Sequence, residues 1–376
     1  MKNLIAATAV LILAANWGFA AGQTGDVLVE ADAEVQPGSK GWHISDRNTS
    51  GRIDYQGMYM KAVGVDPMEE TTGRLMAAEL ETTATINDGE RDVLDMAVQW
   101  PYVTQMNGID GRGRQMHFGN AYAIYKMGLG KPNIRFGQFV APFGNLPYYE
   151  THTRPLQSLY PQSLGIRIDR GVSVEGFRGD YDYWIAVMGG NGARKDNNGN
   201  PMLLGRIGRR FDLNNGGTLT AGVSGLYGTD MPRFSTLIDP VMEEAMMGHP
   251  VHHSLTFTDK ARIAVDAEYA KGRDTWRTEL IGGRDSDGRV NGQFFQWNRE
   301  VNEKSEITAQ LARWEQPTGS RTRFGLGYGY MLDGSTTVRA ATERSLGRVP
   351  GEGRDSTMFT LQLSREFGSV FNKQRI

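Results

Sequence analysis

Hydrophobic and polar residues alternate one by one along much of this chain, and the stretch from Phe118 to Gly192 shows the pattern clearly. One face of its first segment would carry Ala121, Ala123, Tyr125, Met127 and Leu129, and the other Asn120, Tyr122, Ile124 and Lys126. A period of two residues is typical of a β-strand with one apolar face. Two hairpins with the short turns GKPN and GD flank one long connection. This arrangement predicts neighbouring strands of a transmembrane β-barrel.

The same pattern predicts sixteen strand-like segments after Gly51. They begin near Arg52, Arg74, Asp92, Phe118, Asn133, Arg170, Tyr181, Met202, Thr218, Ala261, Thr275, Val290, Ser305, Thr322, Thr336 and Thr357. Connections after the even segments are short, whereas most connections after the odd segments are longer. Outer-membrane barrels combine an even strand number with short periplasmic turns and longer outside loops. We therefore predict an all-β fold, a transmembrane antiparallel β-barrel of about 16 strands.

The faces of these strands distinguish a membrane barrel from a soluble β-sandwich. Phe324, Leu326, Tyr328, Tyr330 and Leu332 alternate with Arg323, Gly325, Gly327, Gly329 and Met331. A sandwich would bury its apolar face and fill it with Val, Ile and Leu, whereas the apolar faces here are aromatic and rich in Ala and Gly. Trp100, Tyr102 and Trp276 lie near predicted strand ends, where barrels place aromatic girdles. The barrel is favoured, with the sandwich as the alternative.

The N-terminus has the pattern of a secretory signal peptide. Lys2 precedes the apolar run LIAATAVLILAA, and the small residues Gly18 and Ala20 stand before the expected cleavage site. We predict a signal peptide at residues 1–20 and the barrel at residues 51–376. Residues 21–50 are acidic and irregular, so they could form a periplasmic lead-in, a small plug segment or an extra strand.

Composition excludes several other classes of protein. Mean hydropathy is −0.45, and beyond the N-terminus no run approaches the roughly 18 apolar residues of a spanning helix. The chain contains no cysteine, which excludes covalently attached c-type haem. The formal net charge is −2, and it becomes −2 − 1 = −3 once Lys2 leaves with the signal peptide. That balance argues against a nucleic-acid partner.

A distinctive phrase, RFGQFVAPFG from Arg135 to Gly144, ends a predicted strand at a Pro-Phe-Gly corner. After the following loop come DRGV from Asp169 and, one hairpin later, VMGGNG from Val187. Over roughly 75 residues this succession resembles the phosphate-selective porin O and P family of outer-membrane channels. The resemblance implies a sixteen-stranded channel, usually trimeric, with an inward-folded third extracellular loop that narrows the pore. The family's phosphate-binding arginine ladder and lysine cluster are not recognisable in this sequence.

The third outside loop, from Gly144 to Asp169, is the expected pore constriction. Its candidate lining residues are Tyr148, Tyr149, Glu150, His152, Arg154, Tyr160, Arg167 and Asp169. At about 3.3 Å per residue, such a loop can extend well beyond the width of the barrel. The alternative, an outside cap with a few buried aromatic residues, has about equal weight.

Alternation also directs charges of both signs toward the lumen. The arginines are Arg135, Arg206, Arg210, Arg262, Arg277, Arg323 and Arg339, and the carboxylates are Glu79, Glu81, Asp266, Glu268, Glu279 and Glu343. Opposed charges across a narrow pore favour small polar solutes, whereas a ring of one sign would select by charge. The favoured alternative is that these charges form cross-strand ion pairs that brace the wall.

The long connection from Met231 to Lys260 contains His249, His252 and His253. Three histidines in five residues could bind a transition metal, but no cysteine or obvious carboxylate completes a site, so a solvated loop is favoured. No nucleotide-binding loop, metalloprotease helix or nucleophile elbow occurs in the sequence. We therefore predict no metal, no cofactor and no enzymatic activity.

The sequence predicts an outer-membrane porin that lets small hydrophilic solutes or ions diffuse passively. Its expected surroundings are outer-membrane lipid and, by the resemblance, two further copies in a homotrimer. The alternative is a barrel that sheathes a partner protein, such as a multihaem cytochrome in an electron conduit. A lumen without large inward side chains would favour the sheath, and an inward third loop would favour the channel. A barrel hydrolase is disfavoured because no Ser/His pair lies on a predicted outer wall.

Overall fold

The computed structural model describes residues 43–63, 74–102, 120–145, 155–156, 158–159, 163–164, 166, 168–190, 200–232, 257–348 and 355–370. All of them belong to one compact unit, Gln36–Ile376. The strands of this part are β1 (His43–Val63), β2 (Arg74–Asn87), β3 (Asp92–Tyr102), β4 (Ala121–Lys126), β5 (Asn133–Val140), β6 (Ile168–Arg178), β7 (Tyr181–Met188), β8 (Met202–Asp212), β9 (Thr218–Pro232), β10 (Phe257–Lys271), β11 (Asp274–Asp285), β12 (Gly288–Asn302), β13 (Ser305–Gln316), β14 (Gly319–Met331), β15 (Thr336–Arg348) and β16 (Asp355–Val370). Within the same residues, none of the helices has the length and apolar character needed to cross a bilayer.

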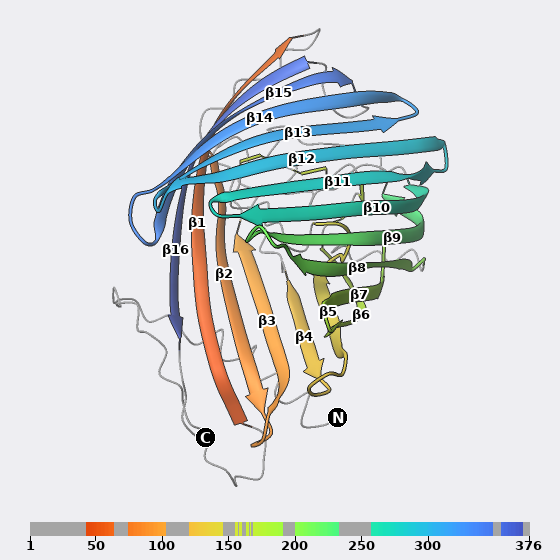
Figure 1. The fold of residues 1–376 in the computed structure, drawn as a ribbon, viewed down its shortest axis with the longest axis vertical. Coiled ribbons are helices and arrows are strands. Elements are labelled where there is room, and N and C mark those ends of the chain that lie inside the picture. The colour runs from red at the N-terminus through yellow and green to blue at the C-terminus, as the bar shows by residue number, and fades with distance from the viewer. Residues whose placement is uncertain are drawn as a thin grey trace, which may run out of the picture. The chain divides into compact units, whose positions relative to one another are not determined.

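These strands form one closed antiparallel barrel in which each strand pairs with its neighbours in the sequence. The last pairing joins β1 to β16, from Asn48 opposite Val370 to Val63 opposite Asp355, and Figure 1 shows these two strands side by side. A closed barrel has no free edge, so every strand finds backbone hydrogen-bond partners on both sides. The predicted antiparallel barrel of sixteen strands is confirmed.

Most strands begin within a few residues of the positions that alternation predicts, but β1 begins at His43 rather than near Arg52. Residues 43–51 pair with β2, from His43 opposite Asn87 to Gly51 opposite Leu80. Their sequence, HISDRNTSG, has no apolar alternation, so only the ladder with β2 identifies them as strand. Residues 43–50 are therefore part of a barrel strand rather than of a segment that precedes the barrel.

The two faces of the wall have opposite character. Large apolar side chains on one face are 42–60% exposed, among them Leu203, Ile207, Leu280, Leu311 and Leu326. The residues between them, including buried charged groups, point to the other face. This pattern inverts that of a soluble protein, in which exposed apolar patches are small. The apolar face is the outer wall of the barrel, and its chemistry suits the hydrocarbon of a membrane.

An aromatic group lies on the outer wall where β10, β11 and β12 meet their short turns. Tyr269 stacks on Trp276 with ring centroids 5.4 Å apart, and Trp276 pairs across the ladder with Trp297. The indole N–H of Trp297 donates to Asp274 at 2.9 Å. Aromatic rings with a polar tip are typical of the boundary between hydrocarbon and water, so this group marks one membrane interface.

Short turns join the even-numbered strands to the strands that follow them. Gly179 and Gly272 have positive φ values of 62° and 59° in the tight turns after β6 and β10, a conformation that favours glycine. In the turn after β14, the carboxylate of Asp333 accepts hydrogen bonds from the backbone N–H and the hydroxyl of Ser335, both at 2.8 Å. These bonds stabilise the charged form and lower the pKa of Asp333 to about 2.

Closure of the barrel predicts its behaviour in detergent. The full-length protein should resist unfolding by SDS until heated, because the ladder has no edge from which to unzip. Removing β16 (Asp355–Val370) should abolish this resistance, since β1 and β15 would both lose a partner. Electrophoresis of unheated and heated samples measures the effect. Identical mobility of the two full-length samples would contradict a closed barrel.

Candidate functional site

The connection between β5 and β6, residues 141–167, contacts the buried face of the wall wherever the structure describes it. We call it the β5–β6 segment. At its start, the N–H of Gly144 donates to the Ser224 hydroxyl of β9 at 2.9 Å. The N–H of Asn145 donates to the Glu279 carboxylate of β11 at 3.0 Å. Ser224 and Glu279 lie near the middle of their strands, so the segment leaves β5 and meets the wall at mid-height.

Three cationic side chains hold carbonyl groups of the β5–β6 segment. Lys260 Nζ donates to the carbonyl of Leu164 at 2.9 Å, and Arg262 Nε donates to that of Ser163 at 3.1 Å. From β14, Arg323 donates to the carbonyl of Ser158 at 2.9 Å. Lys260 is only 1% exposed, and a buried ammonium group requires such acceptors. The cations therefore join the segment to β10 and β14.

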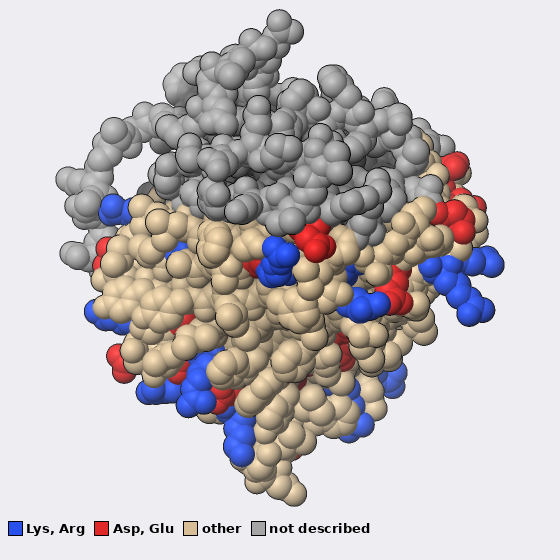
Figure 2. All heavy atoms as spheres, turned by 90° about the horizontal axis from the view of Figure 1, so that it is seen from above, with Lys and Arg blue, Asp and Glu red and all other residues tan. Residues whose placement is uncertain are grey.

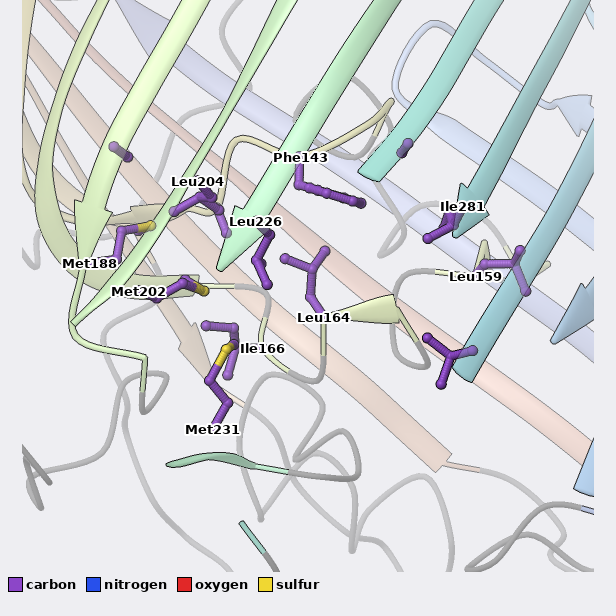
Figure 3. Close-up of a cluster of buried hydrophobic side chains, with 14 of the residues drawn as sticks. Phe143, Leu159, Leu164, Ile166, Met188, Met202, Leu204, Leu226, Met231 and Ile281 are labelled. Atoms are coloured by element: carbon purple, nitrogen blue, oxygen red, sulfur yellow. The ribbon is translucent and has the colours of Figure 1, made fainter. Parts of the chain in front are cut away.

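An apolar cluster packs the β5–β6 segment against the wall. Figure 3 shows Leu164 and Ile166 beside side chains of β8 and β9, with Leu159 closer to Ile281 of β11. The cluster contains Phe139, Ala141, Phe143, Leu159, Leu164, Ile166, Ala186, Met188, Met202, Leu204, Leu226, Met231, Ala264, Ile281, Val290, Phe294, Ala312 and Trp314. Burying one such large side chain contributes about 1.5–3 kcal/mol. Several are buried together, so this packing anchors the segment strongly.

A row of glycines on β14 receives the far part of the segment. A Cβ atom on Gly325 would lie 2.7 Å from Leu156, closer than van der Waals contact, whereas one on Gly327 would lie at 3.7 Å. Leu156 therefore fills the space that the missing side chain of Gly325 leaves. Alternation in the sequence already shows that one face of this strand consists of glycines. The β5–β6 segment packs against that face.

Arg206 is the centre of a buried ion-pair network that links three strands. Its guanidinium contacts Asp266 of β10 at 2.7 Å and Asp182 of β7 at 2.8 Å, and the arginine is only 3% exposed. A Cβ atom on Gly222 would lie 2.5 Å from Arg206 Nη2, so glycine makes room for the guanidinium. Because the buried guanidinium is paired with these carboxylates, it connects β7, β8 and β10 and stabilises this part of the wall.

Arg135 is held in a different way, by aromatic rings and one carboxylate. Its Nε and Nη2 donate to the two oxygens of Glu175 at 2.9 and 3.0 Å. The guanidinium carbon lies 4.4 Å from the ring centroid of Tyr122 and 4.6 Å from that of Trp184. Such contacts are cation–π interactions, and they fix the guanidinium plane. Arg135 therefore supports the wall of β4–β7.

The other predicted lumen charges occupy several environments. Arg277 pairs with Glu268 at 2.5 Å directly across the ladder, whereas Arg262 pairs with Asp285. Arg210, on the same face as Arg206, is exposed beside Asp212. Partly buried or buried positions are occupied by Glu81, Glu279, Arg323, Arg339 and Glu343, and the side chain of Glu79 lies outside the described residues. Figure 2 shows positive and negative side chains interspersed over the visible face.

Of the predicted constriction residues, the structure describes Asp169 alone. The other seven, Tyr148, Tyr149, Glu150, His152, Arg154, Tyr160 and Arg167, lie outside the described residues. Asp169 is buried, and its carboxylate accepts hydrogen bonds from the N–H of Gly190 at 2.6 Å and of Arg170 at 2.8 Å. These two hydrogen bonds link the start of β6 to the end of β7.

Sequence reasoning missed Lys260, Ser224, Asp182 and Glu306, which all contribute to the inner contacts. A signal for two of them exists in the sequence. Lys260 has the same alternation as Arg262, and Asp182 the same as Trp184. The partners could not be found in this way, since the carbonyl that Lys260 binds is 96 residues away.

The inner face has two parts of different chemistry. The apolar cluster covers mainly β7 to β12, under the β5–β6 segment. Buried polar side chains of β12, β13, β15 and β16 form the other part, which contains Gln296, Thr308, Gln310, Glu343, Ser345, Thr360, Gln362 and Ser364. Glutamine, serine and threonine can exchange hydrogen bonds with water and polar solutes. All eight of these side chains are buried, at 0–9% exposed, so the polar part is a closely packed hydrogen-bonding surface.

A recess opens between the β5–β6 segment and the polar part. Its cavity volume is about 20 Å³, which is room for a water molecule. The residues around it are Pro155, Leu156, Glu306, Thr308, Gly327, Tyr328, Gly329, Arg339 and Ala340. Arg339 Nε lies 3.3 Å from Glu306 Oε1 in this recess.

In the described part of the chain, no group of His, Asp and Glu side chains could hold a metal ion. His249, His252 and His253 lie outside it.

Comparison with known proteins identifies the fold. No family model matches the sequence, and no curated protein matches it either. Among solved structures, an anion-selective porin from Comamonas acidovorans is similar at 12% identity, with a TM-score of 0.60, over 85% of this chain and 99% of that chain. A loop L8 deletion mutant of OmpT, an outer membrane protein of Vibrio cholerae, has 13% identity and a TM-score of 0.59 over 85% and 99%. OprB of Pseudomonas putida has 12% identity and a TM-score of 0.54 over 87% and 94%.

The chain therefore has the fold of outer-membrane porin barrels. The finer resemblance to the phosphate-selective O and P family has no support from a sequence match.

The Arg206 network predicts a large effect of Asp266→Asn. The variant removes the Asp266 carboxylate that contacts the buried Arg206 at 2.7 Å. Breaking a buried pair costs on the order of 3–5 kcal/mol, so the free energy of unfolding should fall by about 3 kcal/mol. Urea-induced unfolding in detergent micelles measures it. Glu315→Gln is the control, since its pair with Arg313 is exposed and contributes about 0–1 kcal/mol. Equal losses in both variants would rule out the network.

Proposed function

We propose that this chain is an outer-membrane porin, a water-filled channel for passive diffusion of small hydrophilic solutes or ions. The observation that carries the proposal is a closed barrel with an apolar outer wall and a charged, polar inner wall. Similar structures are described as an anion-selective porin and as outer membrane proteins, which supports the same location and role. Residues 1–20 are the proposed export signal.

The β5–β6 segment is the proposed constriction of this channel, folded into the lumen at mid-height. Support comes from its contacts with Ser224, Glu279 and Gly325, each of which lies near the middle of its strand. The segment covers the apolar part of the inner face, whose contact with water would be unfavourable.

The channel selects solutes by their size and, more weakly, by their charge. The inner arginines are largely paired, as in Arg277 with Glu268 and Arg339 with Glu306, so neither sign dominates the wall. Paired charges of both signs favour small polar solutes over either ion class. Binding along the passage must stay weak, because a tight site would block flux. No chemical step is required of any residue.

A sheath around a partner protein fits the inner face less well. Large side chains such as Phe294, Trp314 and Arg262 are buried on that face, and the β5–β6 segment packs against them. A partner threaded through the barrel would need that volume. The channel is therefore the better proposal.

Homotrimer formation is proposed from the short wall of β4, β5 and β7. These strands have 6, 8 and 8 residues, whereas β10 and β12 have 15 each. At about 3.3 Å per residue and a tilt of about 40°, eight residues rise about 20 Å, short of the roughly 25 Å apolar band of such barrels. Another copy of the chain would cover this wall. A trimer form of OmpT among the similar structures supports the number three.

Replacing residues 147–164 with a short Gly-Ser linker tests the constriction. Single-channel conductance in a planar bilayer should rise several-fold and ion discrimination should weaken, because the narrowest section is removed. The matched control replaces an equally long stretch, 235–252, of the connection after β9, and should leave conductance unchanged. A linker variant that folds and conducts like the parent would make the segment an outside cap.

A point variant repeats this test without a deletion. Gly325→Val should push Leu156 away from β14 and change conductance, since the new Cβ atom has no room. Gly327→Ala adds a Cβ atom at an ordinary contact distance and should have no effect.

A charge on the short wall tests the trimer. Ile185 of β7 and Leu280 of β11 are both exposed on the outer wall. Ile185→Arg should split the trimer into monomers on a native gel, because it places a charge in the interface. Leu280→Arg, the control, faces lipid and should leave the assembly intact, although it costs stability. Trimers that survive Ile185→Arg would place the interface elsewhere.

A further inference from the structure

Glu279 of β11 is a carboxylate of the inner wall that forms no ion pair within the described residues. Glu175 and Glu268, by contrast, both pair with arginines. One oxygen of Glu279, Oε2, accepts the N–H of Asn145 at 3.0 Å. The other, Oε1, accepts no hydrogen bond from a described residue, yet it is not a buried atom, so it stays open to water. The charge of Glu279 is therefore neither paired with a cation nor closed off from the lumen.

The register of the barrel places a second carboxylate directly opposite Glu279. Asp266 of β10 pairs with Glu279 across the ladder, and like charges in this position repel each other. Arg206 contacts Asp266 at 2.7 Å and Asp182 at 2.8 Å, but it forms no ion pair with Glu279 in the described part of the chain. The arginine of this level thus serves the neighbouring carboxylates, and the charge of Glu279 remains.

The other neighbours of Glu279 supply no cation either. On β12 the residue directly opposite is Phe294, which is buried and apolar. The next inward residue of β11 toward the short turns is Arg277, which pairs with Glu268 at 2.5 Å. Lys260 lies six residues from Asp266 on β10, or about 20 Å along the strand, farther than the screening length of about 10 Å at 0.1 M salt. The local potential at Glu279 is therefore negative.

Glu279 also borders the place where the β5–β6 segment meets the wall. A Cβ atom on Gly144 would lie 2.5 Å from Glu279 Oε2, and the φ value of Gly144 is 59°, a conformation that favours glycine. The backbone of the segment can therefore lie directly against the carboxylate. An ion that crosses the proposed constriction at this corner comes close to Glu279.

A structural role alone does not account for the charge of this residue. The N–H of Asn145 needs an acceptor, and a neutral glutamine of the same size would provide one without repulsion from Asp266. Local rules of this kind are commonly broken at functional sites. The negative charge itself, rather than the hydrogen bond, therefore needs a function.

We propose that Glu279 gives this channel a preference for small inorganic cations such as K⁺ over Cl⁻. Its open oxygen attracts a passing cation and repels an anion at the constriction. A single carboxylate oxygen without further ligands holds a cation weakly, which flux requires. This assignment rests on the proposed porin function. It adds a sign to the charge selection of the channel, because the paired charges elsewhere on the inner wall largely cancel.

Reversal potentials in a KCl gradient across a planar bilayer test the proposal, at about pH 8.5 so that carboxylates carry their charge. The wild-type channel should prefer K⁺. Glu279→Gln should lower the permeability ratio of K⁺ to Cl⁻ several-fold, because the variant removes the charge and keeps an acceptor for Asn145. Glu315→Gln is the matched control. Glu315 follows the buried Trp314 on β13 and lies on the outer wall, so this variant should leave the ratio unchanged.

Glu279→Asp separates the charge from the hydrogen bond. It keeps the negative charge but shortens the side chain, which weakens the contact with Asn145. We expect this variant to retain the preference for K⁺. The opposite pattern, with the preference lost in Glu279→Asp and kept in Glu279→Gln, would make Glu279 an anchor of the segment only. Heat-dependent gel mobility checks the folding of each variant, and either one that folds tests the proposal.

The outcomes also separate this proposal from the porin function. A conducting wild-type channel without a preference for K⁺, or with a preference that survives in folded Glu279→Gln, would overturn the role of Glu279 and leave the porin function intact. A wild-type barrel that folds but conducts no ions would instead overturn the porin function.

Discussion

The closed hydrogen-bond ladder is the constraint on which the rest of this structure depends. Each strand must pair on both sides, and the pairing of β1 with β16 removes the last free edge. Once the ladder is closed, alternation sends one side chain outward and the next inward along every strand. The outer residues become a largely apolar wall, and the buried charged residues of the inner face need partners inside the barrel.

That demand explains the paired charges of the inner face. Arg206 is satisfied by Asp266 and Asp182, Arg135 by Glu175 and two aromatic rings, and Lys260 by a backbone carbonyl. Glycines accompany them, because a guanidinium or a leucine fits against the wall only where a neighbouring side chain is absent. The glycine content of the chain, 48 residues, thus serves the inside of the barrel as well as its turns.

The β5–β6 segment divides the interior into two environments. Its apolar residues cover the apolar part of the wall, and cations of β10 and β14 hold its carbonyl groups. The ion pair of Glu306 and Arg339 spans β14, where Gly329 lies opposite both residues. The ion pairs of the inner face therefore use the same residue types at different depths of burial.

The sequence by itself determined the strands, their number and the inward side of Arg206 and Asp266, since these follow from a local period of two residues. It missed residues 43–50 of β1, which lack that period. Only the tertiary structure decided which charges pair. Arg206 meets Asp266 across 60 residues, while Arg210 on the same face stays exposed, because register and packing, not alternation, decide which side chains of different strands come within reach of one another. The contacts of the β5–β6 segment were likewise beyond the sequence, since no local period links Leu164 to Lys260.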